Sequence, residues 1–283
     1  MNLLKSMENN DIFSQSELII RNYVLNQKEN IMSLTVNEIA SSNFVSKSTL
    51  TRFSQKLGFS GWNEFKLSFL KELNIEKVTL SNVDYNFPFS ETDSPLSIAN
   101  KLQIMKKDTI SHTYNLLDVT TLRQSLELLC SQDHIHIFGE GYSLITSTDF
   151  CYRMIRIGKH VSNSNEMGMS YIARTLNKKD LAIVVSYSGR TKSVLNATSI
   201  LKKNNVPILS ITTREDNPIS ELSDISLYLP TKEDLYSKIA NYSTVDSMRF
   251  IFDILFSIYF NTNYNLNLNK RISIARIVDK KND

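Results

Sequence analysis

The chain has 283 residues, of which 41% are hydrophobic and 22% are charged, and its formal net charge is +3. This length fits about two domains with ordinary packed cores, whereas so small a net charge does not identify a partner. No uninterrupted apolar run reaches the ~18 residues of a membrane span, and the first residues, MNLLKSMENNDIF, lack the apolar core of a signal peptide, so we expect a cytoplasmic protein with no membrane partner.

Residues 1–77 have the pattern of several short helices. Ser14 lies three residues before Glu17, which is the spacing of a capping box at a helix start. Within residues 33–59 a short apolar-faced helix is followed by a turn and by a second helix, for which Ser46 is the expected N-cap. This order of elements predicts a helix-turn-helix DNA-binding domain.

The second helix of this motif has an inward and an outward face. Helical phasing places Leu50, Phe53 and Leu57 on the inward stripe. Small hydroxyl side chains near the helix start, with Arg52 one turn later, suit a helix that approaches the major groove closely, so we expect Arg52 to contact a base edge and the lysines to contact phosphates. The alternative is an ordinary surface helix, which also carries polar residues outward. The complete set of expected DNA contacts is Ser46, Lys47, Ser48, Thr49, Thr51, Arg52, Gln55 and Lys56.

The pattern changes after residues 78–96, which contain two prolines and several turn formers, and we expect a linker there. A helix is expected over 96–117, and short apolar runs then alternate with helix-length segments. The expected strands are 134–139, 159–163, 181–189, 206–213 and 224–230. Runs such as LAIVV are typical of strands that are covered on both faces. The sequence therefore predicts an α/β protein in which an all-α helix-turn-helix domain precedes a doubly wound parallel sheet.

Two strand-to-helix loops of this sheet, FGEGYS and SYSGRT, combine glycine with hydroxyl side chains. Hydroxyls, backbone N–H groups and the positive end of a helix dipole together can hold a phosphate. Two such loops at one sheet edge would form a ligand crevice. The alternative is that each serine only caps the helix that follows it. The expected phosphate-binding residues are Gly141, Ser143, Ser186, Ser188, Gly189 and Thr191.

The segment VSKSTLTRFSQKLGFSGWNEFKLSFLKEL (45–73) resembles the helix-turn-helix of the RpiR/MurR family of bacterial transcription regulators, in which V-S-x-x-T-x-x-R-F followed by L-G-F-x-G-x-x-E-F-K is typical. The resemblance implies that the partner is a double-stranded DNA operator. One difference lies in the turn, where helix-turn-helix proteins often have glycine and this chain has Phe44. Because phenylalanine disfavours left-handed backbone, we expect Asn43 to take that conformation.

Residues of roughly 108–250 resemble the sugar isomerase (SIS) domain, whose S-x-S-G-x-T loop binds the phosphate of phosphosugars. The resemblance implies hydroxyl contacts from Ser143, Ser186, Ser188 and Thr191, with the backbone of Gly141 and Gly189 nearby. Many family members carry an aspartate and then a histidine after the second strand; this chain has NSNEMGMSYIA, in which Glu166 takes the place of the aspartate and nothing replaces the histidine. The segment 241–260 resembles the closing helix that packs subunits in this family.

Isomerisation of a sugar phosphate needs a base, usually Glu or His. The candidates here are Glu140, Glu166 and the histidines, but His134 and His136 lie on an expected strand, where packing is the common role. Because a DNA-binding module is attached, we expect a sensing site with no catalytic residue.

The sequence predicts neither a cofactor nor a metal site. A GxxxxGK(S/T) loop is absent, and Gly139 and Gly141 lack the third glycine of a dinucleotide fingerprint. The two cysteines, Cys130 and Cys151, form no CxxC pair and have no histidine cluster beside them, so we expect two buried free thiols.

The sequence as a whole predicts a transcription regulator of sugar or amino-sugar metabolism genes that is controlled by a phosphosugar and acts as a homo-oligomer, a dimer or a tetramer. A phosphosugar isomerase or deaminase with a helical assembly domain is the alternative, and a module for oligomerisation alone is a third possibility. The expected domains are a helix-turn-helix domain (1–77), a linker with a connecting helix (78–107), the SIS domain (108–260) and a tail (261–283).

Overall fold

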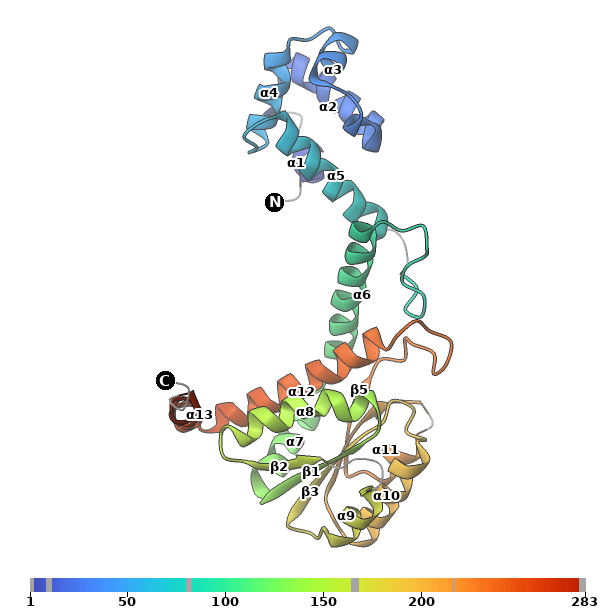
Figure 1. The fold of residues 1–283 in the computed structure, drawn as a ribbon, viewed down its shortest axis with the longest axis vertical. Coiled ribbons are helices and arrows are strands. Elements are labelled where there is room, and N and C mark those ends of the chain that lie inside the picture. Colours follow the sequence, from blue (N-terminus) through green and yellow to red (C-terminus); the bar gives the residue numbers. More distant parts are fainter. Residues whose placement is uncertain (1–2, 9–11, 80–82, 164–167, 216, 280–283) are drawn as a thin grey trace. The chain divides into compact units, whose positions relative to one another are not determined.

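The structure is a computed structural model, and it describes residues 3–8, 12–79, 83–163, 168–215 and 217–279 (Figure 1). The chain divides into two compact units. The N-terminal unit comprises Met1–Val83 with Phe89–Ile104, and the C-terminal unit comprises Asp84–Pro88 with Met105–Asp283. Within the described ranges, no helix has both the length and the apolar character needed to cross a bilayer.

The N-terminal unit is helical throughout its regular elements. These are α1 (Leu3–Glu8), α2 (Gln15–Gln27), the 3-10 helix η2 (Lys28–Met32), α3 (Val36–Ser42), α4 (Lys47–Lys56) and α5 (Trp62–Thr79). The predicted capping box of Ser14 and Glu17 opens α2, and Ser46 is the N-cap of α4. The expected pair of helices, α3 and α4, is therefore confirmed.

Aromatic side chains form the centre of this unit. Phe53 of α4 is fully buried, and its ring centroid lies 5.3 Å from that of Phe13 and 5.2 Å from that of Phe65. Leu50 and Leu57 are buried on the same stripe, as the phasing predicts. Because this stripe supplies the core, the opposite face of α4 is left to solvent.

The turn between α3 and α4 contradicts the expectation for Asn43. Asn43 has a φ of −109°, whereas Phe44 takes the left-handed φ of 54°. Asn43 instead ends α3, since its side-chain Nδ2 donates a hydrogen bond of 2.8 Å to the carbonyl of Ile39. The Phe44 side chain is 98% exposed, so packing in this chain does little to offset its unfavourable backbone conformation.

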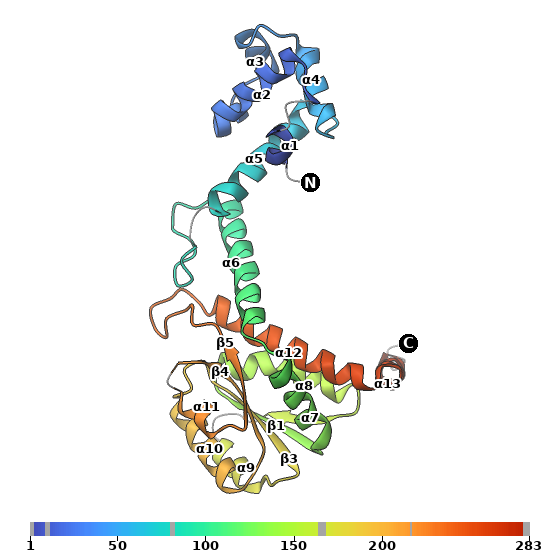
Figure 2. The same cartoon turned by 180° about the vertical axis from the view of Figure 1, so that it is seen from behind.

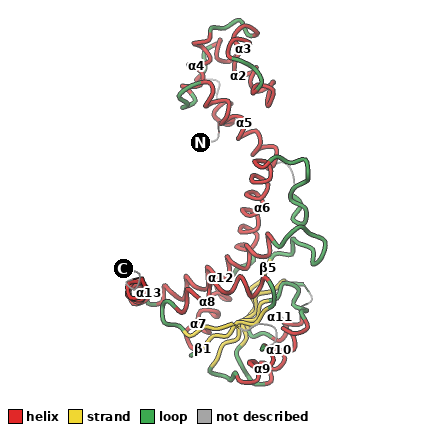
Figure 3. Tube along the Cα trace, in the orientation of Figure 1, coloured by secondary structure: helices red, strands yellow, loops and turns green. Residues whose placement is uncertain are grey.

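The C-terminal unit holds a five-stranded sheet (Figures 2 and 3). Every pair of neighbouring strands is parallel, and the strand order is β2-β1-β3-β4-β5. The helix α6 (Pro95–Asn115) starts among residues of the N-terminal unit and ends in this one. The elements that follow are α7 (Val119–Ser131), β1 (His134–Gly139), α8 (Tyr142–Ile155), β2 (His160–Asn163), α9 (Met169–Thr175), β3 (Asp180–Val185), α10 (Lys192–Lys203), β4 (Ile208–Thr213), α11 (Pro218–Leu222), β5 (Ile225–Leu229), α12 (Tyr242–Thr262) and α13 (Tyr264–Asp279). All five predicted strands are present.

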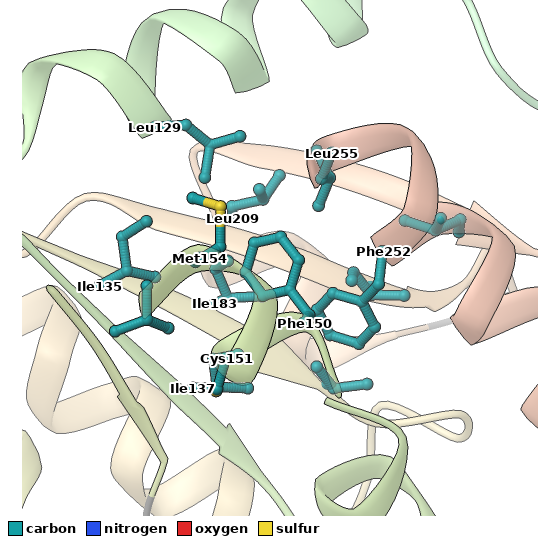
Figure 4. Packing of buried hydrophobic residues seen from close by; sticks show 14 of the residues in the cluster. Leu129, Ile135, Ile137, Phe150, Cys151, Met154, Ile183, Leu209, Phe252 and Leu255 are labelled. Atoms are coloured by element: carbon teal, nitrogen blue, oxygen red, sulfur yellow. The ribbon is translucent and has the colours of Figure 1, made fainter. Parts of the chain in front are cut away.

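Alternate strand residues pack on opposite faces of the sheet. Ile135 and Ile137 of β1 lie in the core with Phe150 of α8 and with residues of α7 and α12 (Figure 4). Phe138 of the same strand packs on the other face, with residues of α9, α10 and α11 such as Val194. The predicted doubly wound arrangement is confirmed.

The expectation of two buried thiols was wrong for one of the cysteines. Cys151 is buried, but Cys130 is exposed, because α7 buries Leu129 and the next residue lies about 100° further round the helix. Within the segment 261–283, for which the sequence predicts a tail, the structure describes the helix α13.

Candidate functional site

The outward face of α4 carries most of the predicted DNA contacts. Thr49 differs from the others: it is only 6% exposed, because it lies one helical turn before Phe53 on the packed side. Its hydroxyl lies 2.9 Å from that of Ser46, which in turn lies 2.7 Å from that of Ser48. Thr49 therefore belongs to a hydroxyl cluster that organises the start of α4. The exposed members of the set are Ser46, Lys47, Ser48, Thr51, Arg52, Gln55 and Lys56.

Lys56 has partners within the N-terminal unit. Its Nζ lies 2.6 Å from Oε2 of Glu17 and donates a hydrogen bond of 2.9 Å to the carbonyl of Ile12. Burial alone would raise the pKa of Glu17, but the hydrogen bonds from Lys56 and Ser14 lower that pKa below its usual value. Lys56 thus ties the end of α4 to the start of α2, a role that the expectation of a phosphate contact did not include.

The two glycine-containing loops meet at the carboxyl edge of the sheet. β1 and β3 are neighbours, and their last residues, Gly139 and Val185, are paired. α8 leaves toward one face and α10 toward the other, since Phe150 and Val194 belong to cores on opposite sides. A sheet of this strand order binds ligands at its β1/β3 switch point.

A pocket of about 480 Å³ opens at this edge, bounded by the β1–α8 loop, the start of α10 and the start of α9. Its Asn196 Nδ2 donates a hydrogen bond of 3.1 Å to Oγ of Ser170, which joins α10 to α9 across it. A volume of this size can hold a ligand such as a small sugar phosphate. The lining residues are Glu140, Ser170, Thr191, Lys192, Ser193 and Asn196.

Internal contacts fix the shape of the SYSGRT loop. Oγ of Ser186 lies 3.1 Å from Oγ1 of Thr191, and Oγ of Ser188 accepts a hydrogen bond of 3.2 Å from the backbone N–H of Arg190. Gly189 has the left-handed φ of 62°. It lies against the side chain of Asn217, which a Cβ at position 189 would overlap. Nδ2 of Asn217 donates a hydrogen bond of 3.0 Å to the carbonyl of Thr213, so the Asn217 side chain is fixed and limits the space beside Gly189.

The helices that follow the two loops begin without a side-chain cap. Gly141 is the N-cap of α8 and Thr191 is the N-cap of α10, and neither makes a side-chain capping bond. Asp118 and Asn217, by contrast, cap α7 and α11 through their side chains. The N-terminal ends of α8 and α10 therefore keep their partial positive charge available to an anion.

All four histidines are described, and the pocket is lined without them. His134 and His136 lie on β1, and both hydrogen-bond the Ser162 hydroxyl. Nε2 of His134 lies 2.8 Å from Oγ of Ser162, and Nδ1 of His136 lies 2.7 Å from it. Burial lowers the pKa of His136 to about 4, with a further contribution from neighbouring His134. These contacts fit the packing role that the sequence predicts for histidines on this strand.

Of the two predicted carboxylate candidates, Glu140 lines the pocket, and Glu166 lies outside the described residues. Across the part of the chain that the structure describes, no group of three or more His, Cys, Asp and Glu side chains is arranged to hold a metal ion.

Sequence reasoning missed three residues that support the SYSGRT loop: Asn217, Tyr187 and Glu233. Asn217 precedes Pro218, and an asparagine before a proline is a helix-start signal that could have identified it as a cap. Tyr187 bonds to Glu233, 46 residues further along the chain, and no local pattern indicates that contact.

Comparison with known proteins identifies both units. The model of the rpiR-family helix-turn-helix domain matches residues 1–76, and the model of the SIS domain matches residues 128–258. A helix-turn-helix-type transcriptional regulator of Clostridium perfringens is 27% identical over 280 residues, which are 98% of this chain and 99% of that protein. Another such regulator, of Haemophilus influenzae, is 32% identical over 224 residues, 78% of this chain and 76% of that protein. The solved structure of Vibrio vulnificus NanR complexed with ManNAc-6P is 23% identical and shares the fold, with a TM-score of 0.59 and 98% of each chain covered.

Proposed function

This chain belongs to the RpiR family of helix-turn-helix transcriptional regulators, and from that premise we propose that a phosphosugar bound between β1 and β3 controls its affinity for an operator of sugar or amino-sugar metabolism genes. The observation that carries this proposal is the meeting of two uncapped helix N-termini with the hydroxyls of Ser186, Ser188 and Thr191 at the switch point. Such donors together match the acceptor oxygens of a phosphate. The ManNAc-6P in the NanR structure supports an amino-sugar phosphate as the first effector to test.

On the DNA side, we assign base contacts to the open face of α4, with Arg52 and Gln55 as the principal side chains. Lys47 and the hydroxyls of Ser46 and Ser48 lie at the exposed start of the helix, which suits contacts to the phosphate backbone. A palindromic operator requires two such helices, so we propose a homodimer as the smallest active unit. The protein would act in the cytoplasm, where its operator lies.

We propose that the site binds its ligand without converting it. Glu140 is the one carboxylate in the described lining of the pocket, and Lys192 is the one basic residue there. Aldose–ketose isomerisation usually requires a positioned base and a second group that opens the ring. An isomerase or deaminase is the competing function, and turnover of a sugar phosphate would support it.

The test is operator binding by the purified full chain, using its own upstream DNA, at fixed salt and with a panel of sugar phosphates that includes ManNAc-6P. Arg52→Ala should weaken operator binding by roughly 5- to 150-fold, because a good base contact contributes about 1–3 kcal/mol, and should leave sugar phosphate binding unchanged. Ser188→Ala should weaken sugar phosphate binding and leave operator binding unchanged when no effector is present. Arg123→Ala and Ser131→Ala, both at exposed positions of α7, are the matched controls. Absence of specific operator binding, or release of an isomerised or deaminated sugar, would contradict the proposal.

A further inference from the structure

The SYSGRT loop is joined to the segment before α12 through Tyr187. The Tyr187 hydroxyl donates a hydrogen bond of 2.8 Å to the carbonyl of Glu233 and lies 3.2 Å from the backbone N–H of the same residue, which donates to it. Nζ of Lys238 lies 5.5 Å from the centroid of the Tyr187 ring and 3.3 Å from Oε2 of Glu233. Tyr187 stands between Ser186 and Ser188, so a ligand that orders those hydroxyls also acts on the position of this ring.

The carboxylate of Glu233 holds the first turn of α12. Its side chain is fully buried, and it accepts hydrogen bonds from the backbone N–H of Ser243 and, at 2.6 Å, from Oγ1 of Thr244. A buried carboxylate is stable only when it is paired and hydrogen-bonded. A movement of Glu233 would leave Lys238 or the start of α12 without its partner, so the residue and the helix are expected to move together.

The same turn of α12 is hydrogen-bonded to α6. Oγ1 of Thr109 donates a hydrogen bond of 2.9 Å to Oγ of Ser243, and one helical turn further on Oγ1 of Thr113 lies 2.8 Å from Oγ of Ser247. All four residues are buried. Figures 1 and 2 show the end of α6 against α12 from both sides. α6 is one continuous helix whose residues up to Ile104 belong to the N-terminal unit.

We infer that Tyr187 and Glu233 are positioning residues that transmit occupancy of the phosphosugar site through Ser243 and Thr109 to α6, and that this chain of contacts carries the coupling between effector and operator. The inference rests on the proposed function of the SYSGRT loop as the effector site. Coupling requires that the ligand favours one arrangement of a packed element over another, and buried hydrogen bonds with few alternatives provide discrete arrangements. α6 has residues in both units, so a change in its hydrogen bonds with α12 changes the packing of a helix on which the N-terminal unit also depends.

The test uses the full chain and the double variant Thr109→Val/Ser243→Ala. The double variant removes both partners of the buried Thr109–Ser243 hydrogen bond, and the Tyr85 hydroxyl, which also contacts Thr109, keeps its hydrogen bond to the Asp108 carboxylate, so the variant is expected to fold. Three quantities are measured: sugar phosphate binding by calorimetry, operator binding without effector, and operator binding with the panel member that changes wild-type affinity most. Wild type should show an effector-induced change in operator affinity of roughly 5- to 150-fold. The double variant should keep both separate binding activities, and its effector-induced change should fall toward 1-fold.

Two further variants make the result specific. Tyr187→Phe removes the hydroxyl that reaches Glu233 and keeps the ring, and it should also reduce the effector-induced change. Ser210→Ala/Ser226→Ala removes another hydroxyl pair of the same unit, 2.8 Å apart between β4 and β5, and should keep the full change. If the Thr109/Ser243 and Tyr187 variants respond to effector as wild type does, the inference is wrong while the proposed function stands. If no sugar phosphate binds to wild type, the proposed function fails first, and the inference fails with it.

Discussion

The two units hold their functional side chains in opposite ways. In the N-terminal unit, Arg52 lies on the open face of a helix whose other face supplies the core, so the site and the core share an element but few contacts. In the C-terminal unit, the SYSGRT loop is part of the packing: Gly189 fits against Asn217, and Tyr187 bonds to Glu233. Substitutions of Arg52 and Gln55 on the open face of α4 should therefore change function without changing stability, whereas substitutions in the SYSGRT loop should change both.

The largest expected effect is that of Gly189→Ala. The new methyl group would overlap the Asn217 side chain, and the alanine backbone would have to keep the left-handed φ of 62°. Overpacking costs about 1–3 kcal/mol and left-handed backbone about 1–2 kcal/mol for a residue with a Cβ, so we expect a loss of about 3 kcal/mol in the free energy of unfolding. Urea unfolding of the full chain, followed by hydrogen exchange in β3, measures this loss, and sugar phosphate binding should be abolished together with it.

Gly141→Ala is the control for that substitution. Gly141 also has a left-handed φ, of 52°, but nothing lies within 4 Å of the position that its Cβ would take. Its backbone angles, φ 52° and ψ −125°, are rarely adopted by a residue with a Cβ, so only this backbone cost of about 1–3 kcal/mol should be lost. Equal losses in the free energy of unfolding for the two variants would mean that Asn217 does not limit the space beside Gly189.

The sequence predicts what depends on local pattern. The five strands are recognisable because parallel strands buried on both faces are continuous apolar runs, and the start of α2 is recognisable because a capping box has fixed spacing. Both loops of the crevice could be identified because each directly follows a strand. The contacts between Gly189 and Asn217 and between Tyr187 and Glu233 could not, because they join segments that only the completed fold brings together. The left-handed conformation of Phe44 could not be predicted either, because the geometry of the turn determined it against the backbone preference of phenylalanine.

Mild acid should distinguish the two units by stability. The four histidines all belong to the C-terminal unit. Burial lowers the pKa of His136 to about 4, against about 6.5 in an unfolded chain, so below pH 6.5 the unfolded state binds the proton more tightly. The stability contributed by neutral His136 is thus complete above pH 6.5 and is lost as the pH falls toward 4, with a slope of up to about 1.4 kcal/mol per pH unit.

The two units can be followed separately in the full chain between pH 7 and 4.5. Trp62, the single tryptophan of the chain, is buried in the N-terminal unit, so its fluorescence reports that unit, while hydrogen exchange in β1 reports the other. We expect the C-terminal unit to lose stability from pH 6.5 downward, whereas the N-terminal unit, in which the pKa of Glu17 is lowered, should begin to lose stability only as the pH approaches the ordinary glutamate value of 4.5. His136→Asn should flatten the dependence on pH, and an unchanged slope in that variant would assign the effect to another group.

The smallest effect should come from Phe44→Gly, which tests whether the turn before α4 is separable from the fold. Phe44 has a left-handed φ of 54°, and its side chain is 98% exposed. Glycine would remove a backbone cost of about 1–2 kcal/mol, but it would lose about 0.5–1 kcal/mol more conformational entropy on folding. The free energy of unfolding of the N-terminal unit should therefore rise by about 0.5–1 kcal/mol. Trp62 fluorescence during urea unfolding measures the gain.

Asn205→Gly is the matched substitution in the C-terminal unit, at a φ of 55°. Asparagine adopts this conformation more readily than phenylalanine, so relief of backbone strain and added entropy should nearly cancel. A gain at position 44 without one at 205 would show that the turn before α4 bears a backbone cost which the folding of its own unit does not require. Loss of stability in Phe44→Gly would instead mean that the exposed ring supports the unit, and the separation of site from core on this side of the molecule would then be incomplete.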